Sequence, residues 1–284
     1  MAADSQATAL LGSTRFNLAL IGFLGCVVIY ALRSDVSFAI VCMVNSTAVD
    51  LLAGNTKSNV SKHTTCQIRD DPADTLNSKK DVIMGELIWP KYVQGSVLSA
   101  FFWGYFCSQI LGGYLAGRYG GRLVIVLGSS ILTMFSPLAA TTSVYAFIAA
   151  RALLGFMQGA IFPAFHTMWS MWAPPLERSL LTGVTYAGAQ IGNTVVMPLS
   201  GLLCKYGFAG GWPSIFYVLG IAGVAWCALW FFYVSDRPSR SKRISKNELN
   251  YIEDSLSDVL SSDAKKALGF LTAIPYIAYF VFIN

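Results

Sequence analysis

Long apolar runs separated by polar segments dominate this chain. A transmembrane helix needs about 20 predominantly apolar residues, and six runs come close to or exceed that length. They cover residues 16–44, 92–116, 123–140, 144–172, 180–203 and 213–234. The pattern predicts an all-α membrane protein whose six transmembrane helices lie within residues 16–234.

The remaining residues divide into three polar segments and one short apolar segment. The polar segments are the N-terminus (1–15), a long loop (45–91) and a hydrophilic loop (235–266). We expect a helix to begin near Ser245, with Ser245 as its cap and Glu248 in the capping-box position. Residues 267–284 form a curtailed apolar run that contains a proline, and it is short for a membrane span.

Basic residues indicate the orientation of the six predicted helices. If the N-terminus is cytoplasmic, the short outer loops contain only Lys205, whereas the cytoplasmic side receives nine basic residues, which is the expected bias. The long loop carries two glycosylation sequons, at Asn45 and Asn59, which favour the non-cytoplasmic side. The nine basic residues are Arg15, Arg118, Arg122, Arg178, Arg237, Arg240, Lys242, Arg243 and Lys246.

Composition supports a membrane protein and argues against several other classes. Of 284 residues, 55% are hydrophobic and 12% are charged, compared with about 25% charged residues in soluble domains. The net charge of +5 is spread between apolar runs, so nucleic-acid binding is not indicated. Five of the six cysteines lie in apolar runs, so we expect no disulfide framework and no metal site. No nucleophile–base arrangement or phosphate-binding loop indicates an enzyme.

Two arginines lie inside apolar runs, where a charge costs roughly 2.5–3.5 kcal/mol on insertion scales. Arg33 lies in the first run, and Arg151 lies about seven residues into the fourth. Each is either a structural arginine paired within the bundle or an anion site, because a guanidinium binds carboxylate or phosphate in a bidentate fork. Asp35 is close to Arg33 in sequence, but residues i and i+2 do not share a helix face.

The fourth run carries several further polar and small residues on one broad helical stripe. At 100° per residue, this stripe contains Arg151, Gly155, Gln158 and His166. The spacing RxxxGxxxG allows a neighbouring backbone to approach closely. His166 is either a proton relay or an ordinary hydrogen-bonded structural histidine.

Two polar turns between the apolar runs carry charged residues. The turn GYLAGRYGGR contains Arg118 and Arg122. The simpler interpretation of this turn is an ordinary cytoplasmic loop that follows the positive-inside rule. In WAPPLERS, we expect the two prolines to stop the fourth helix. Glu177 and Arg178 would then lie in a loop, where they could contact another cytoplasmic loop.

These segments resemble the major facilitator superfamily. GYLAGRYGGR resembles its loop between helices two and three, and RALLGFMQG resembles its fourth-helix motif. YALRSDVSFAI, FFWGYFCSQILGGYLAGR and HTMWSMWAPPLERS are similar to segments of the anion–cation symporter family. That family comprises sialin, type I phosphate transporters and vesicular glutamate transporters. This sequence is most similar to the sialin-like members.

The resemblance implies alternating-access transport of a small organic or inorganic anion within a lipid membrane, coupled to H⁺ or Na⁺ and without a cofactor. Arg33 matches the family's substrate-linked arginine, and His166 matches its fourth-helix histidine. Leu154 and Gln158 stand where sialin has two glutamates linked to proton coupling. The candidate substrate-binding residues are Arg33, Arg151, Gln158, Tyr30 and Tyr105, and the candidate coupling or gating residues are His166, Glu177, Arg178, Arg118 and Arg122.

Members of this family have twelve helices in two halves. The resemblance therefore implies that this chain is an N-terminal half with part of a further helix, and that it does not transport alone. The alternatives are a sodium-dependent phosphate-type cotransporter, a non-transporting half-carrier that pairs with a second half, a channel, and a structural membrane protein. The family resemblance leads us to expect a plasma, lysosomal or vesicular membrane.

Overall fold

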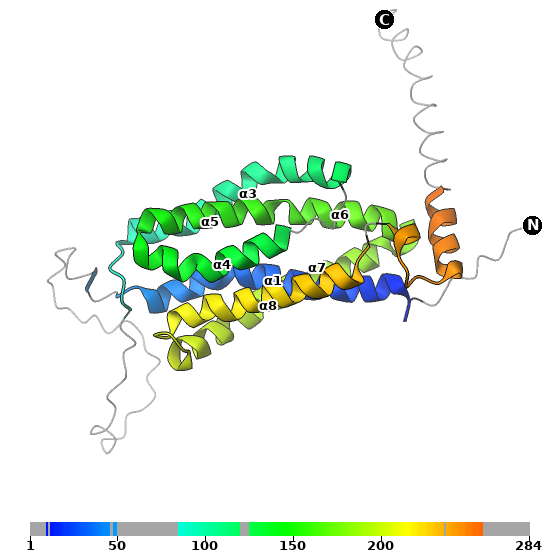
Figure 1. Ribbon diagram of the computed structural model, residues 1–284. Helices are drawn as coiled ribbons and strands as arrows, with labels where there is room; N and C mark the ends of the chain where they lie inside the picture. Colours follow the sequence, from blue (N-terminus) through cyan, green and yellow to red (C-terminus); the bar gives the residue numbers. More distant parts are fainter. Residues whose placement is uncertain are drawn as a thin grey trace, which may run out of the picture.

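The computed structural model is a bundle of long helices that lie side by side (Figure 1). It describes residues 10, 12–45, 48–49, 85–119, 125–235 and 237–257, except the side chains of 110–119 and 125–127. No strand is formed within these ranges, and one isolated bridge pairs Val44 with Leu87. The all-α prediction is confirmed. The helices are α1 (Thr14–Met43), α3 (Lys91–Tyr119), α4 (Ile125–Thr142), α5 (Val144–Gly159), α6 (Ile161–Trp172), α7 (Pro175–Tyr206) and α8 (Trp212–Tyr233), with a 3-10 turn η1 (Pro238–Arg240).

Three helical stretches in the described part of the chain are long and apolar enough to cross a membrane: Thr14–Met43, Val144–Trp172 and Trp212–Tyr233. Five of the six predicted spans correspond to one helix each, with ends displaced by a few residues. The fourth is divided into α5 and α6 at Ala160. Pro163 explains the division, because proline lacks the N–H that would bond to the carbonyl of Gly159.

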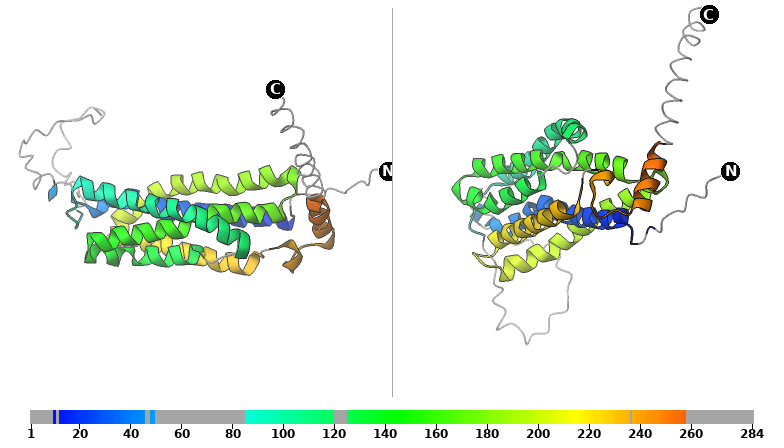
Figure 2. Two further views of the ribbon diagram at one scale, coloured as in Figure 1. Left: turned by 90° about the horizontal axis from the view of Figure 1, so that it is seen from above. Right: turned by 45° about the vertical axis from the view of Figure 1, so that its right-hand side comes forward.

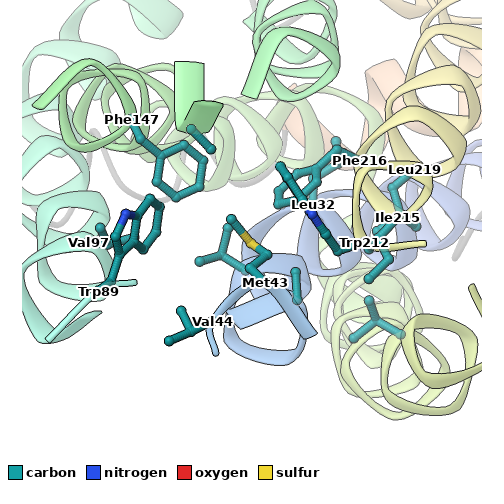
Figure 3. Close-up of a cluster of buried hydrophobic side chains, with 14 of the residues drawn as sticks. Leu32, Met43, Val44, Trp89, Val97, Phe147, Trp212, Ile215, Phe216 and Leu219 are labelled. Atoms are coloured by element: carbon teal, nitrogen blue, oxygen red, sulfur yellow. The ribbon is translucent and has the colours of Figure 1, made fainter. Parts of the chain in front are cut away.

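The helices pack mainly in three pairs, α1 with α7, α3 with α5 and α4 with α8. Buried apolar side chains form one cluster near the end of α1, where the rings of Trp89 and Phe147 lie 5.5 Å apart and Met43 is fully buried (Figure 3). A second cluster, which includes Trp169, Trp172 and Trp226, lies toward the start of α1. A short helix at 246–257 lies at that same end of the bundle, drawn in orange in both views of Figure 2.

Glycines allow α3 and α5 to approach closely. A Cβ at Gly155 would collide with the carbonyl oxygen of Phe101, and a Cβ at Gly104 would collide with the carbonyl oxygen of Ala152. The two helices therefore meet backbone to backbone, as the small-residue spacing after Arg151 predicts.

The two prolines of WAPPLERS begin a helix instead of leaving a loop. Pro174 is the N-terminal cap residue of α7 and Pro175 is its first residue. Proline is favourable there because its missing N–H would have no intrahelical partner. The loop prediction for Glu177 and Arg178 is therefore wrong, since both lie in the first turn of α7.

A disulfide joins Cys42 near the end of α1 to Cys204 near the end of α7, with their Cα atoms 6.3 Å apart. Both cysteines lie in predicted apolar runs, from which we expected no disulfide framework, and that expectation is wrong for this pair. The two cysteines are separated by 162 residues, and only the parallel packing of α1 and α7 brings them together.

Several predicted features fall outside the described residues. They are Asn59, Arg122, most of the 45–91 loop and the apolar segment 267–284. The backbone of Arg118 lies in α3, but its side chain is not among those described.

We expect Gly155→Ala to weaken the contact between α3 and α5. The added methyl group overpacks a backbone contact, and such overpacking typically costs about 1–3 kcal/mol. Gly201→Ala is the matched control, because a Cβ there meets nothing within 4 Å. Thermal unfolding in detergent should show a lower midpoint for Gly155→Ala than for the control, and equal midpoints would contradict the close approach.

Candidate functional site

Arg33 lies in an aromatic cage. Its guanidinium carbon is 5.6 Å from the ring centroid of Tyr30, 5.2 Å from that of Phe101, and 5.1 Å from those of Phe102 and Tyr105. Tyr30 lies one turn earlier on α1, and the other three rings come from α3. The negative faces of such rings attract a cation. Among the described residues, no carboxylate forms an ion pair with Arg33.

Arg151 is held differently, because it forms a buried ion pair with Asp35. Arg151 Nη2 donates to Asp35 Oδ1 over 3.0 Å, and both side chains are almost fully inaccessible. Asp35 Oδ1 also accepts from the backbone N–H of Val36 at 2.6 Å. Asp35 Oδ2 and Arg151 Nε have no hydrogen-bond partner in the described structure. The two charges therefore balance each other, and each side chain keeps one atom without a hydrogen-bond partner among the described residues.

Both arginines line a cavity of about 230 Å³ between α1, α3 and α5. They lie at a similar depth, since Arg33 is ten residues before the end of α1 and Arg151 is seven residues after the start of α5, at the same end of the bundle. The other lining residues are uncharged: Ser34, Val36, Ser37, Val97, Leu98, Phe101 and Phe102. The site thus combines two guanidinium groups with an apolar, aromatic wall.

The remaining predicted substrate residues differ in their relation to this cavity. Tyr30 and Tyr105 contact Arg33 but are not among the lining residues. Gln158 is buried elsewhere on α5, and neither its amide nitrogen nor its amide oxygen has a partner among the described atoms. The structure therefore brings Arg33, Arg151 and the two tyrosines together and leaves Gln158 apart.

His166 lies on α6 and does not line the cavity. Its ring is exposed and packs 5.4 Å from the ring of Tyr186 on α7. Tyr186 packs against Phe162, which contacts Tyr30. A row of rings thus connects His166 to the aromatic cage of Arg33.

A second cluster of charges lies at the start of α1. Arg15 is fully buried and pairs with Glu177 of α7, and its Nε donates to Glu248 Oε1 over 3.1 Å. The backbone N–H groups of Thr14 and Arg15 also donate to the carboxylate of Glu248, at 3.2 and 3.1 Å. Glu248 therefore caps α1 and fixes the 246–257 helix against the bundle.

The observed contacts of Glu248, Glu177 and Arg178 differ from the predicted ones. The capping-box role of Glu248 in its own helix is wrong, because its carboxylate binds α1. The charge contact expected of Glu177 is present, but its partner is Arg15 and not a loop residue. Arg178 donates weakly, at 3.4 Å, to the carbonyl oxygens of Ser170 and Ala173.

Asn45, the asparagine of the first sequon, lies at the end of the bundle opposite Glu248. Its backbone N–H donates to the carbonyl oxygen of Leu87 over 2.9 Å. Its side-chain oxygen accepts from the N–H of Ala48 over 3.0 Å.

Sequence reasoning missed Asp35, Phe101 and Phe102 as site residues. Asp35 was weighed only as a partner of Arg33, and its separation of 116 residues from Arg151 left no local signal. The two phenylalanines follow one another in an apolar run, where nothing distinguishes a residue that faces an arginine from one that faces lipid.

The Major Facilitator Superfamily model matches residues 73–284. The chain belongs to the Major Facilitator Superfamily. As a superfamily member it is a multi-pass membrane protein, and its relatives are transporters and not enzymes.

The superfamily relatives share substantial sequence with the chain. It is 50% identical over 260 residues to the uncharacterized transporter slc-17.2 of Caenorhabditis elegans, covering 90% of this chain and 50% of that protein. Identity is 42% to human sialin (88% and 48% covered) and 39% to a putative inorganic phosphate cotransporter of Drosophila melanogaster (94% and 49%). The chain spans about half the length of these curated relatives.

The superfamily fold is also found in solved structures. The inward open conformation of the xylose transporter XylE from E. coli matches with a TM-score of 0.52 and 16% identity. That match covers 90% of this chain and 56% of the xylose transporter. At this level of identity the likeness concerns the fold alone.

Glu248→Gln should destabilise this superfamily member, because Arg15 then loses the carboxylate of Glu248. Removing one member of a buried ion pair costs on the order of 3 kcal/mol. The measurement is thermal unfolding combined with limited proteolysis of the 246–257 helix. Glu253→Gln on the same helix is the control, since Glu253 is exposed. Identical unfolding of the two variants would show that the Glu248 contacts contribute nothing.

Proposed function

We propose that this chain carries the anion-binding part of a carrier that moves an organic anion across a membrane by alternating access, together with H⁺ or Na⁺. The observation that supports the proposal most is Arg33. It is half-buried, it lines a cavity and it is surrounded by aromatic rings without a carboxylate partner among the described residues.

An arginine in these surroundings is suited to bind an anion. The rings cover its faces, but the N–H donors at its edge stay available for a bidentate carboxylate. The apolar wall formed by Val97, Leu98 and Phe101 lowers the local dielectric constant and strengthens the attraction. Ser37 adds a hydroxyl donor, whereas the hydroxyl of Ser34 already donates to Asn193 at 2.6 Å.

The lining favours an organic over an inorganic anion. Phenylalanine and leucine side chains offer contact area to a carbon skeleton, which phosphate does not have. The second candidate is a phosphate-type cotransporter, and it is favoured by the 39% identity to the Drosophila protein. Superfamily carriers hold substrate between two repeats, so we expect further helices, from this chain or from a second half-carrier, to complete the cavity.

We assign gating and coupling roles to the charges outside the cavity. Glu177 holds the start of α7 against Arg15, and Arg178 holds the end of α6 through two carbonyl groups. His166 is the candidate proton-binding group, because an imidazole side chain can both accept and donate a proton. These contacts place Glu177 and Arg178 where α6 and α7 meet.

We also propose that the end of the bundle near Asn45 faces the non-cytoplasmic side. The Cys42–Cys204 disulfide lies at this end, and disulfides persist in oxidising compartments. The basic residues 237–246 lie at the opposite end, near Glu248, as the positive-inside rule expects of cytoplasmic segments.

This orientation predicts glycosylation at Asn59 and not at Asn45. Asn45 follows the end of α1 by two residues and its side chain is hydrogen-bonded, so the enzyme that adds the glycan cannot reach it. Electrophoresis before and after glycosidase treatment should show a shift that Asn59→Gln abolishes and Asn45→Gln preserves. A shift that survives Asn59→Gln, or none in the unmodified protein, contradicts the assignment.

The anion site predicts that Arg33→Gln reduces anion binding at least tenfold, because a charge-assisted bidentate contact typically contributes about 1.5–3 kcal/mol. Arg33→Lys should give an intermediate loss, since an ammonium keeps the charge but not the fork. Binding of sialic acid, glutamate and phosphate to the chain in lipid nanodiscs is the measurement. Lys205→Gln, which removes a charge on α7 outside the cavity, is the control. Equal binding by the Arg33→Gln and control variants would refute the proposed function.

A further inference from the structure

We propose that Asp35 is a specificity-determining residue that restricts this site to singly charged anions. This inference rests on the proposed anion site and adds the charge of its ligand. It is carried by the difference between the two arginines at the cavity, of which one has a carboxylate partner and the other has none among the described residues.

Among the described residues, the charges at the cavity sum to a single positive charge. Arg33 and Arg151 each contribute +1, and Asp35 contributes −1 through its 3.0 Å contact with Arg151. The other lining side chains are serine, valine, leucine and phenylalanine, which carry no charge. A monoanion therefore neutralises the site, whereas a dianion leaves one uncompensated negative charge.

An uncompensated charge matters here because Asp35 and Arg151 are buried and apolar side chains line much of the cavity. Two unit charges interact far more strongly at an effective dielectric constant near 20 than in bulk water. Leaving one member of such a group unpaired is strongly unfavourable. The excess negative charge of a bound dianion would lie beside the carboxylate of Asp35, so repulsion adds to the desolvation cost.

Asp35 acts through Arg151 and not by touching the ligand. Its side chain is fully buried and is not among those that line the cavity, whereas Arg151 is. Arg151 lines the cavity while its charge is balanced by Asp35, so a ligand there would meet a guanidinium group that adds no net charge. Asp35 thus cancels the positive charge of Arg151 while the Arg151 side chain still lines the cavity.

The test compares two anions built on the same benzene ring, benzoate with one carboxylate and phthalate with two. It is made near neutral pH, where the carboxylates of both ligands are ionised. Both are titrated against the chain in lipid nanodiscs, and the ratio of their dissociation constants is the measurement. We expect the unmodified protein to bind benzoate more tightly. Asp35→Asn keeps the side-chain shape but raises the site charge to +2, so the ratio should shift toward phthalate about tenfold or more.

Two further variants separate charge from structural damage. Arg151→Gln removes one guanidinium group and leaves Asp35 without its ion-pair partner, so it should weaken the binding of both anions. The double variant Asp35→Asn/Arg151→Gln returns the charge to +1 through Arg33 alone, so the preference for benzoate should return. A mere folding defect would not reverse a preference and then restore it.

The outcomes distinguish this inference from the proposed function. If the unmodified protein binds neither anion, no anion site of this kind exists and both proposals fail. If it binds benzoate and Asp35→Asn leaves the ratio unchanged, the anion site stands and the role of Asp35 is overturned. An unmodified protein that prefers phthalate would likewise overturn the role of Asp35.

Discussion

A positive charge buried among apolar helices must be compensated, and this bundle compensates its arginines in three different ways. Arg15 pairs with the carboxylates of Glu177 and Glu248 and lies over an aromatic ring. In the described structure, Arg151 pairs with Asp35, and Arg33 lies among aromatic rings without a carboxylate. Aromatic faces weaken the desolvation penalty without cancelling the charge. The anion that we propose to bind at Arg33 would relieve the remaining penalty, because Arg33 is the least compensated of the three arginines among the described residues.

The packing of α3 on α5 determines whether Arg33 has its cage at all. The backbone of α3 that meets Gly155 runs from Phe101 to Tyr105, and these same residues supply rings around Arg33. One turn before Gly155, Arg151 faces Asp35 on α1. A small residue at position 155 therefore positions the aromatic wall and the second guanidinium together, which connects a packing motif to the chemistry of the cavity.

The sequence predicts the helices well because apolar length is a local property that each run carries by itself. It predicts the contacts between them poorly. Asp35 with Arg151, Cys42 with Cys204, and Arg15 with Glu248 are separated by 116, 162 and 233 residues, and no local pattern marks such partners. Proline is ambiguous for a different reason, since it can end one helix or begin the next, and Pro175 does the latter.

The same long-range contacts limit how the bundle can move. α1 is joined to α7 at one end through Arg15 and Glu177 and at the other through the Cys42–Cys204 disulfide. The hydrogen bond from Ser34 to Asn193 connects the two helices near Arg33. A helix held at both ends and beside its binding residue cannot tilt independently of its neighbour. For the carrier that we propose, access to Arg33 would change through rigid-body motion of this bundle against further helices, as in superfamily carriers that rock one repeat against another.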